Sequence, residues 1–138
     1  MTRHSVDLKT LLINHEGIRL KPYTDTVGKL TIGVGRNLAD KGITHAEALA
    51  MLDKDIADAT KDCLHEFPWF VGLTEPRKWV ILSMVFNLGL DGPKKVKRML
   101  ACVELEAYQG AAWAMAQSKW AQQVGMRAVE LQEMMRGH

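Results

Sequence analysis

The chain has 138 residues and a mass of 15.5 kDa, a size at which one domain can bury a hydrophobic core without disulfides or metals. Apolar residues make up 47% and charged residues 25% of the chain, which excludes a disordered or fibrous protein. The net charge of +2 is too small to indicate nucleic-acid binding, and we expect no nucleic-acid partner.

No segment of the sequence predicts a membrane span or a secretory signal. The longest nearly continuous apolar run, residues 79–90, is well short of the ~20 residues that cross a bilayer, and it contains Ser83 and Asn87. The first seven residues form no apolar segment with a cleavage site. We therefore expect a protein made in a cytoplasm, without stable membrane insertion.

The cysteines and histidines indicate neither a disulfide framework nor a metal site. Cys63 and Cys102 match no metal-ligand spacing, and free, mostly buried thiols are the expectation in a reducing compartment. The five histidines form no HExxH motif or similar ligand pair. We expect no metal and no cofactor.

The N-terminal part of the chain predicts a helix followed by a hairpin. Ser5 can cap a helix whose leucines at 8, 11 and 12 lie on one face, and this helix should end near Glu16 and Gly17. Residues 18–34 are β-prone and interrupted by glycines, with a turn at residues 26–29. This pattern is typical of a small antiparallel hairpin.

The remainder of the sequence predicts helices. Thr44 and Glu47 have the spacing of a capping box, and an apolar stripe then predicts a long helix from about 44 to the mid-60s. Residues 67–72 break this helix, and Pro76 introduces an apolar helix that ends near residue 88. Three helices follow: a short one that begins at 92–93, an alanine-rich one over 104–117 and an amphipathic one over 127–136. The total is six or seven helices.

These elements predict a mainly helical α+β fold and a single domain over residues 1–138. We expect a small sheet lobe over about 17–45 and a connecting helix over about 44–66. The helical lobe should cover about 67–138 and include the first helix. A cleft between the two lobes is the expected binding site.

Two acidic residues are candidates for chemistry in such a cleft. Glu16 lies at a helix end, and Asp25 lies in the hairpin that folds back toward it. Glycoside hydrolysis needs one protonated carboxyl group for the leaving oxygen and one ionised carboxyl group that activates water or attacks the sugar. Spacing alone is a weak signal, because most of the 16 acidic residues are expected to be solvated surface charges.

The segment from residue 16 to residue 35 resembles the active-site segment of phage-type lysozymes, or endolysins, of glycoside hydrolase family 24. Glu16, Asp25 and Thr31 have the Glu-x8-Asp-x5-Thr spacing of that family. Residues 44–47, 83–89 and 118–128 also resemble family segments in the same order, so the resemblance covers most of the chain. It implies a lysozyme-like fold and hydrolysis of the β-1,4 bond between N-acetylmuramic acid and N-acetylglucosamine in bacterial peptidoglycan.

The resemblance also implies a role for each candidate residue. Glu16 is expected to be the general acid, kept protonated by partial burial. Asp25 should position or deprotonate the attacking water or stabilise developing positive charge, and Thr31 should hold that water. The simpler alternatives are a solvated carboxylate, a turn-forming aspartate and a β-prone threonine.

Three further residues are assigned from the resemblance to support of catalysis and to binding. Arg127 is expected to reach the carboxyl group of Glu16. Phe86 and Asn87 are expected to contact the sugar or its peptide. An exposed arginine at a helix start and a phenylalanine packed in the core are the alternatives.

The tryptophans and the paired glycines are not assigned to the site. Trp69, Trp79, Trp113 and Trp120 lie at helical spacing in apolar segments, so we expect them in the core. The Gly-Val-Gly at 33–35 lacks the third glycine and the lysine of a nucleotide-binding loop.

The sequence departs from the family pattern after the hairpin. Many members have histidine directly after the last hairpin glycine, where this chain has Arg36, so a pH-sensitive ion pair is expected to be missing. Residues 36–44 also form a short connection, which reduces the expected glycan-binding surface of the sheet lobe.

Three hypotheses for function are open at this point. They are a hydrolytic lysozyme, a lytic transglycosylase that uses one glutamate and releases an anhydro product, and a non-catalytic peptidoglycan-binding or phage structural module. Asp25 and Thr31 favour water as the group that receives the cleaved sugar, which argues against a transglycosylase. The presence of Glu16 argues against a module that has lost catalytic activity. The lysozyme hypothesis implies a monomer that waits in the host bacterial cytoplasm and reaches the cell wall through a holin.

Overall fold

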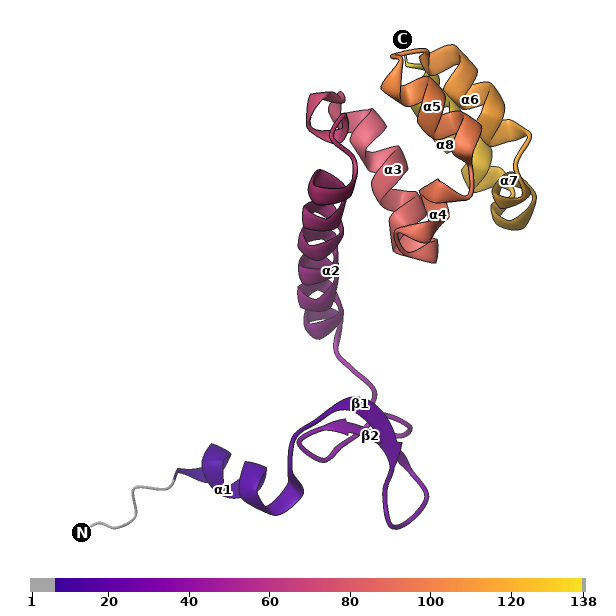
Figure 1. The fold of residues 1–138 in the computed structure, drawn as a ribbon. Helices are drawn as coiled ribbons and strands as arrows, with labels where there is room; N and C mark the ends of the chain where they lie inside the picture. The colour runs from indigo at the N-terminus through magenta and orange to yellow at the C-terminus, as the bar shows by residue number, and fades with distance from the viewer. Residues whose placement is uncertain (1–6, 138) are drawn as a thin grey trace. The chain divides into compact units, whose positions relative to one another are not determined.

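The computed structural model describes residues 7–137, and the chain divides into two compact units, Met1–Ala50 and Met51–His138 (Figure 1). The first unit contains a short helix and a small sheet, whereas the second unit is helical. The predicted mainly helical α+β class is confirmed. Within residues 7–137, no helix has the length and apolar character needed to span a membrane.

Helix α1 (Leu8–Glu16) is capped at both ends. Asp7 is its N-cap residue, and Oδ1 accepts the backbone N–H of Thr10 at 2.8 Å. The predicted cap, Ser5, lies outside the described residues. At the other end Gly17 has a φ of 76° and donates its N–H to the Ile13 carbonyl at 2.7 Å, so Glu16 ends the helix, as predicted.

Three short antiparallel strands follow in the order β1 (Arg19–Thr24), β2 (Leu30–Gly33) and β3 (Arg36–Asn37). Thr31 on β2 lies opposite Tyr23 on β1 and opposite Asn37 on β3. The predicted hairpin is confirmed. Strand β3 was not predicted, because two residues are too few to show an alternating pattern.

The first unit has almost no apolar interior of its own. Among its described residues 7–50, only Thr31 is buried, with 2% of its surface exposed. The leucines of α1 are exposed, and α1 has no buried residue. Because apolar burial is the main driving force for folding, the local shape of this unit depends on backbone pairing, turns and polar side-chain contacts.

Helix α2 (His45–Glu66) begins with the predicted capping box. Thr44 Oγ1 accepts the N–H of Glu47 at 3.1 Å, and Glu47 Oε1 accepts the N–H of Thr44 at 2.8 Å. Ala59 and Cys63, on the apolar stripe, are buried in the core of the second unit, and burial raises the pKa of the Cys63 thiol to about 11. The long helix predicted here is confirmed.

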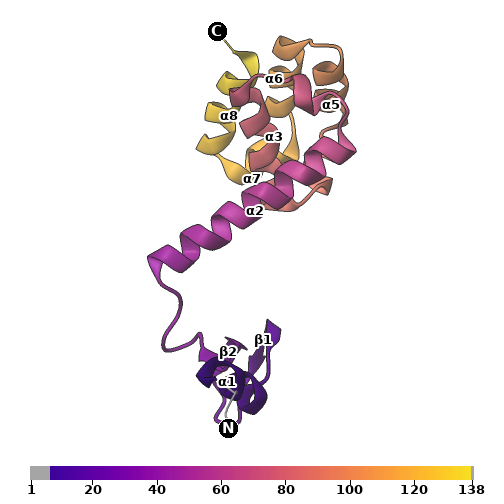
Figure 2. The ribbon, with the colours of Figure 1, turned by 90° about the vertical axis from the view of Figure 1, so that its left-hand side faces the viewer.

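The second unit packs short helices around an apolar core (Figure 2). These elements are the 3-10 turn η1 (Phe70–Gly72), α3 (Glu75–Leu88), α4 (Asp91–Lys94), α5 (Lys97–Glu104), α6 (Tyr108–Ala116), α7 (Lys119–Val124) and α8 (Met126–Arg136). Helix α6 contacts α5 and α8, and α3 contacts α4 and α8. Four methionines are fully buried in this core, where their flexible side chains suit the irregular gaps between short helices.

The alanine-rich helix predicted over 104–117 is present as α6, but it begins later than predicted. Helix α5 ends at Glu104 and α6 begins at Tyr108. Glu106 between them has a φ of 58°, a conformation that cannot continue a right-handed helix. Helices α5 (Lys97–Glu104) and α7 (Lys119–Val124) were not predicted, so residues 7–137 contain eight α-helices rather than six or seven.

The prediction that all four tryptophans lie in the core was half wrong. Trp120 is buried and Trp69 packs against the core. Trp79 and Trp113 are 53% and 54% exposed. Both residues lie within helices. The spacing of apolar residues shows which of them share one face of a helix, but it does not show whether another helix or strand covers that face.

Arg77 in the first turn of α3 fixes the end of α8. Its Nε and Nη2 donate to the carbonyl oxygens of Met135 and Arg136, both at 2.8 Å, and its guanidinium lies 3.7 Å from the centroid of the Tyr108 ring. The last carbonyls of a helix lack partners within the helix, so a charged donor satisfies them well. Helices α3 and α8 carry three of the predicted site residues, and Arg77 holds these helices together.

Candidate active site

Glu16 ends α1 with its carboxyl group against the backbone of Gly35. A Cβ placed on Gly35 would lie 2.7 Å from Oε1 and 3.2 Å from Cδ of Glu16. Gly35 also has a φ of 67°, a conformation that favours glycine, and a larger residue there would require the Glu16 carboxyl group to move. Within the first unit α1 buries no face and Glu16 is exposed, and the burial of Glu16 in a cleft between the lobes stays a prediction.

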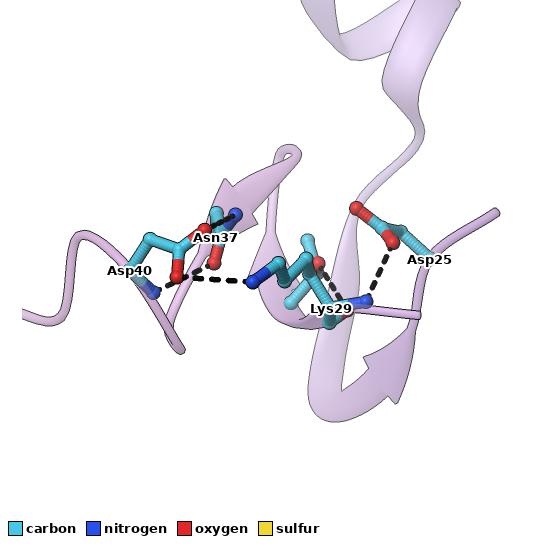
Figure 3. A network of polar contacts seen from close by, with 5 residues as sticks. Asp25, Lys29, Asn37 and Asp40 are labelled. Carbon is cyan, nitrogen blue, oxygen red and sulfur yellow. Dashed lines mark hydrogen bonds and ion pairs between the residues drawn. The ribbon is translucent and has the colours of Figure 1, made fainter. Parts of the chain in front are cut away.

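Asp25 follows β1 and holds the turn that leads to β2. Its Oδ1 accepts the backbone N–H groups of Val27 at 3.0 Å and Lys29 at 2.8 Å, and its own N–H donates to the Lys29 carbonyl at 2.9 Å. Figure 3 shows the carboxylate beside Lys29. Because the turn uses Oδ1, Oδ2 is the oxygen that can bind water, and the turn-forming and catalytic interpretations of Asp25 are compatible.

Thr31 is a buried polar side chain two residues beyond Lys29. Its hydroxyl donates to the Lys29 carbonyl at 2.9 Å, and the same carbonyl accepts the N–H of Asp25. A threonine hydroxyl has one proton to donate. With that proton committed to Lys29, Thr31 Oγ1 can only accept a further hydrogen bond.

The side chain of Lys29 links this turn to the segment after β3. Its Nζ lies 3.3 Å from Asp40 Oδ1, and Asn37 Nδ2 donates to Asp40 Oδ2 at 3.1 Å (Figure 3). The N–H of Asp40 also donates to Asn37 Oδ1 at 2.9 Å. These three residues match no catalytic motif, and the Asn-x-x-Asp spacing of a side-chain turn is their one local signal in the sequence.

An ion pair joins β3 to the first turn of α2. Arg36 Nη1 lies 2.6 Å from Glu47 Oε1, the oxygen that also accepts the N–H of Thr44. The hydrogen bond from Arg36 is the largest cause that lowers the pKa of Glu47, to about 2, and the same bond raises the pKa of Arg36. The position where the family often has histidine therefore holds a cation that stays charged at neutral pH.

In the second unit, Phe86, Asn87 and Arg127 line one hollow of about 290 Å³, with walls completed by Ser83, Val124, Glu130 and Leu131. Phe86 is 52% exposed, so the hypothesis that it packs in the core is wrong. Arg127 is exposed in the first turn of α8. The structure thus brings together the three residues that were predicted to support catalysis and binding.

A larger apolar groove of about 640 Å³ shares Ser83 and Phe86 with this hollow. Side chains of α2 and α3 form most of its walls, and Trp79 is among them. The spacing of apolar residues predicted Trp79 in the core. This prediction is wrong because residues that line an apolar groove have the same spacing as residues in a core.

The predicted site residues therefore form two groups. Glu16, Asp25 and Thr31 belong to the first unit, whereas Phe86, Asn87 and Arg127 belong to the second. The predicted contact of Arg127 with Glu16 remains a prediction. Within residues 7–137, no group of three or more His, Cys, Asp or Glu side chains could hold a metal ion.

The family model for phage lysozymes matches residues 13–136, a range that includes both groups of site residues. The chain belongs to the phage lysozyme family, and the resemblance inferred from its motifs is confirmed. It is accordingly a glycosidase of the lysozyme class that lyses peptidoglycan.

Curated relatives include lysozymes, endolysins and a phage structural protein. The chain is similar to probable T4-type lysozyme 1 of Dictyostelium discoideum, with 29% identity over 88% of each chain. It is 32% identical to a SAR-endolysin of Escherichia phage Mu, over 95% of this chain and 77% of that protein. It is also 27% identical, over 90% of its length, to the pre-baseplate central spike protein Gp5 of Enterobacteria phage T4, of which it covers 26%.

We predict that Gly35→Ala lowers the hydrolysis of peptidoglycan at least tenfold, because its Cβ would displace the carboxyl group of Glu16. The positive φ should also cost about 1 kcal/mol of stability. Release of soluble glycan from purified cell walls measures the effect. Gly33→Ala is the matched control, with a φ of 70° and nothing within 4 Å of the added Cβ. Equal loss of activity in both variants would contradict the steric argument.

We predict that the charge of Glu47 stabilises the protein in a pH-dependent way. A carboxyl group with a pKa of 4.5 when unfolded and about 2 when folded contributes stability above pH 4.5 and loses it as the pH falls toward 2. Wild type should therefore unfold at a higher temperature than Glu47→Gln at neutral pH, and this difference should vanish near pH 2. Exposed Glu104→Gln, followed by circular dichroism in the same buffers, should match wild type throughout. A Glu47→Gln difference that does not change with pH argues against the ion pair.

Proposed function

We propose that this lysozyme hydrolyses the β-1,4 bond between N-acetylmuramic acid and N-acetylglucosamine, with Glu16 as general acid and Asp25 and Thr31 acting on the attacking water. The observation that carries the proposal is the attachment of Asp25 and Thr31 to the main chain of Lys29. This attachment leaves one carboxylate oxygen and one hydroxyl lone pair free. Both atoms can accept a hydrogen bond. A bound water molecule that donates both of its hydrogens needs two such acceptors.

In the proposed reaction, the water donates one hydrogen to Asp25 Oδ2 and the other to Thr31 Oγ1. Its lone pair is then free to attack the anomeric carbon of the muramic acid residue. The bond from that carbon to the glycosidic oxygen breaks as Glu16 gives its proton to the leaving oxygen, and Asp25 takes a proton from the attacking water. The products are a free reducing end and a free 4-hydroxyl group. Because water attacks the face of the sugar ring opposite the leaving oxygen, the configuration at the anomeric carbon is inverted.

We propose that Phe86, Asn87 and Arg127 bind the glycan or its peptide and that Arg127 supports Glu16. The exposed ring of Phe86 offers an apolar face, and Asn87 beside it offers both a donor and acceptors. Arg127 adds a cation to the same hollow, which suits a carboxylate of the peptide stem or of the enzyme itself.

We further propose that residues 1–138 act as one monomeric lysozyme domain. It would be held in the host bacterial cytoplasm until a holin gives it access to the cell wall. The endolysin relatives support a role in host cell lysis. A monomer is the simplest state for an enzyme that acts on a polymeric wall.

We predict that Glu16→Gln abolishes lysis while preserving the fold, because the amide has the shape of the acid but no transferable proton. The measurement is the loss of turbidity of outer-membrane-permeabilised Gram-negative cells, with muropeptide products identified by mass. Wild type and Glu104→Gln, which changes an exposed glutamate at the end of α5, should clear the cells and release reducing ends. Anhydro products would favour a transglycosylase, and undiminished lysis by Glu16→Gln would remove Glu16 from the acid role.

We predict that Phe86→Ala raises KM for soluble peptidoglycan fragments about fivefold, with a much smaller change in kcat. This pattern is typical of a residue that binds substrate and transition state equally. Trp113→Ala is the control, because Trp113 has nearly the same exposed fraction and does not line the hollow. Equal effects of the two substitutions on KM would show that the hollow has no special part in binding.

A further inference from the structure

Glu16 ends a helix that buries no residue, so contacts within the first unit other than burial must place its carboxyl group. The group lies instead against the backbone of Gly35, within 2.7 Å of the position that a Cβ would occupy. Gly35 directly precedes strand β3. The position of Gly35 therefore depends on what holds β3 in place.

Pairing with β2 holds β3 only weakly. Strand β3 has two residues, Arg36 and Asn37, which lie opposite Ile32 and Thr31. Strands in globular proteins are usually longer than this, and so short a ladder gives little resistance to displacement. The N–H groups of Leu38 and Ala39 also donate to the Leu30 carbonyl, but they follow β3, whereas Gly35 precedes it. A further attachment at Arg36, next to Gly35, would hold the Gly35 backbone more accurately.

The side chain of Arg36 provides that attachment. Its Nη1 lies 2.6 Å from Glu47 Oε1 and 3.4 Å from the Gly42 carbonyl oxygen. The side chains of Arg36 and Glu47 are 29% and 39% exposed, so the pair is partly shielded from water. Charge-assisted hydrogen bonds of this kind are roughly twice as strong as neutral ones.

Glu47 is itself fixed by the start of a long helix. The oxygen that binds Arg36 also accepts the N–H of Thr44, and the N–H of Glu47 donates to Thr44 Oγ1. Helix α2 continues for 22 residues from this point. The hydrogen bonds thus form a chain from the capping box through Glu47 to Arg36, and the backbone continues it to Gly35.

We propose that Arg36 and Glu47 are positioning residues for Glu16, because their ion pair holds the Gly35 backbone against the Glu16 carboxyl group. The consequence for catalysis rests on the proposed function of Glu16 as general acid. A shift of about 1 Å in a reacting group can reduce the rate up to ~100-fold, so a small movement of β3 would matter.

The experiment uses the full chain and four substitutions. Arg36→Met removes the charged guanidinium group and keeps an unbranched apolar stem. Glu47→Gln is the second disruptive variant. Glutamine removes the charge of Glu47 but keeps an oxygen that can accept the capping N–H, so this variant tests the proposal if Arg36→Met fails to fold. Arg36→Lys is the conservative variant, since only one nitrogen of Arg36 reaches Glu47. Val103→Ala removes buried apolar surface from α5 in the second unit and leaves the capping box and the ion pair unchanged, and so controls for lost stability.

Two readouts are made on each protein. The first is the nuclear Overhauser effect between the γ protons of Glu16 and the α protons of Gly35, which requires no turnover. The second is kcat and KM on soluble peptidoglycan fragments. We expect Arg36→Met and Glu47→Gln to lose the Overhauser effect and to lower kcat about tenfold, with KM nearly unchanged. Arg36→Lys and Val103→Ala should retain both the Overhauser effect and kcat.

The possible outcomes separate this inference from the proposed function. If the Overhauser effect persists in both disruptive variants, the ion pair does not position Glu16 and the inference is overturned. It is also overturned if the effect is lost while kcat remains that of wild type. If the wild-type protein shows no hydrolysis but the disruptive variants still lose the effect, the positioning by the ion pair stands and the proposed function fails.

Discussion

The main chain of Lys29 is the point on which the arrangement of Asp25 and Thr31 depends. Its N–H donates to the Asp25 carboxylate, and its carbonyl accepts both the Asp25 N–H and the Thr31 hydroxyl. The backbone groups of a hydrogen-bonded turn move little. The N–H and carbonyl of Lys29 therefore orient the side chains of Asp25 and Thr31 before a water molecule binds. Orientation of this kind is what a preorganised site needs, because the protein then does not have to rearrange during the reaction.

Polar contacts carry an unusual share of the organisation of the first unit. Only one of its described residues is buried, whereas hydrogen bonds and ion pairs join its turn, its strands and the start of α2. Single exposed ion pairs contribute only about 0–1 kcal/mol. Several contacts that share atoms, as at Glu47 Oε1, can fix a geometry more firmly than the same contacts placed apart. Such a unit also opens locally at a lower free energy than a packed core.

The sequence predicted those features that local rules determine. The end of α1 at Glu16, the hairpin turn after Asp25 and the capping box of Thr44 and Glu47 each follow from neighbouring residues. The ion pair of Arg36 was not predictable, because its partner is 11 residues away across a turn whose path no motif defines. The break at Glu106 was not predictable from the sequence, because the alanine-rich residues near it indicate a helix. A single residue with a left-handed backbone conformation produces no recognisable sequence pattern.

The ion pair between Arg36 and Glu47 has a consequence for how the enzyme responds to pH. Arginine stays protonated at every physiological pH, and Glu47, with a pKa of about 2, stays ionised down to acidic pH. A histidine at position 36 would instead lose its charge as the pH rises through neutrality. The contact that holds β3 therefore persists from acidic conditions upward. Any change of activity near neutral pH must arise from groups other than this pair.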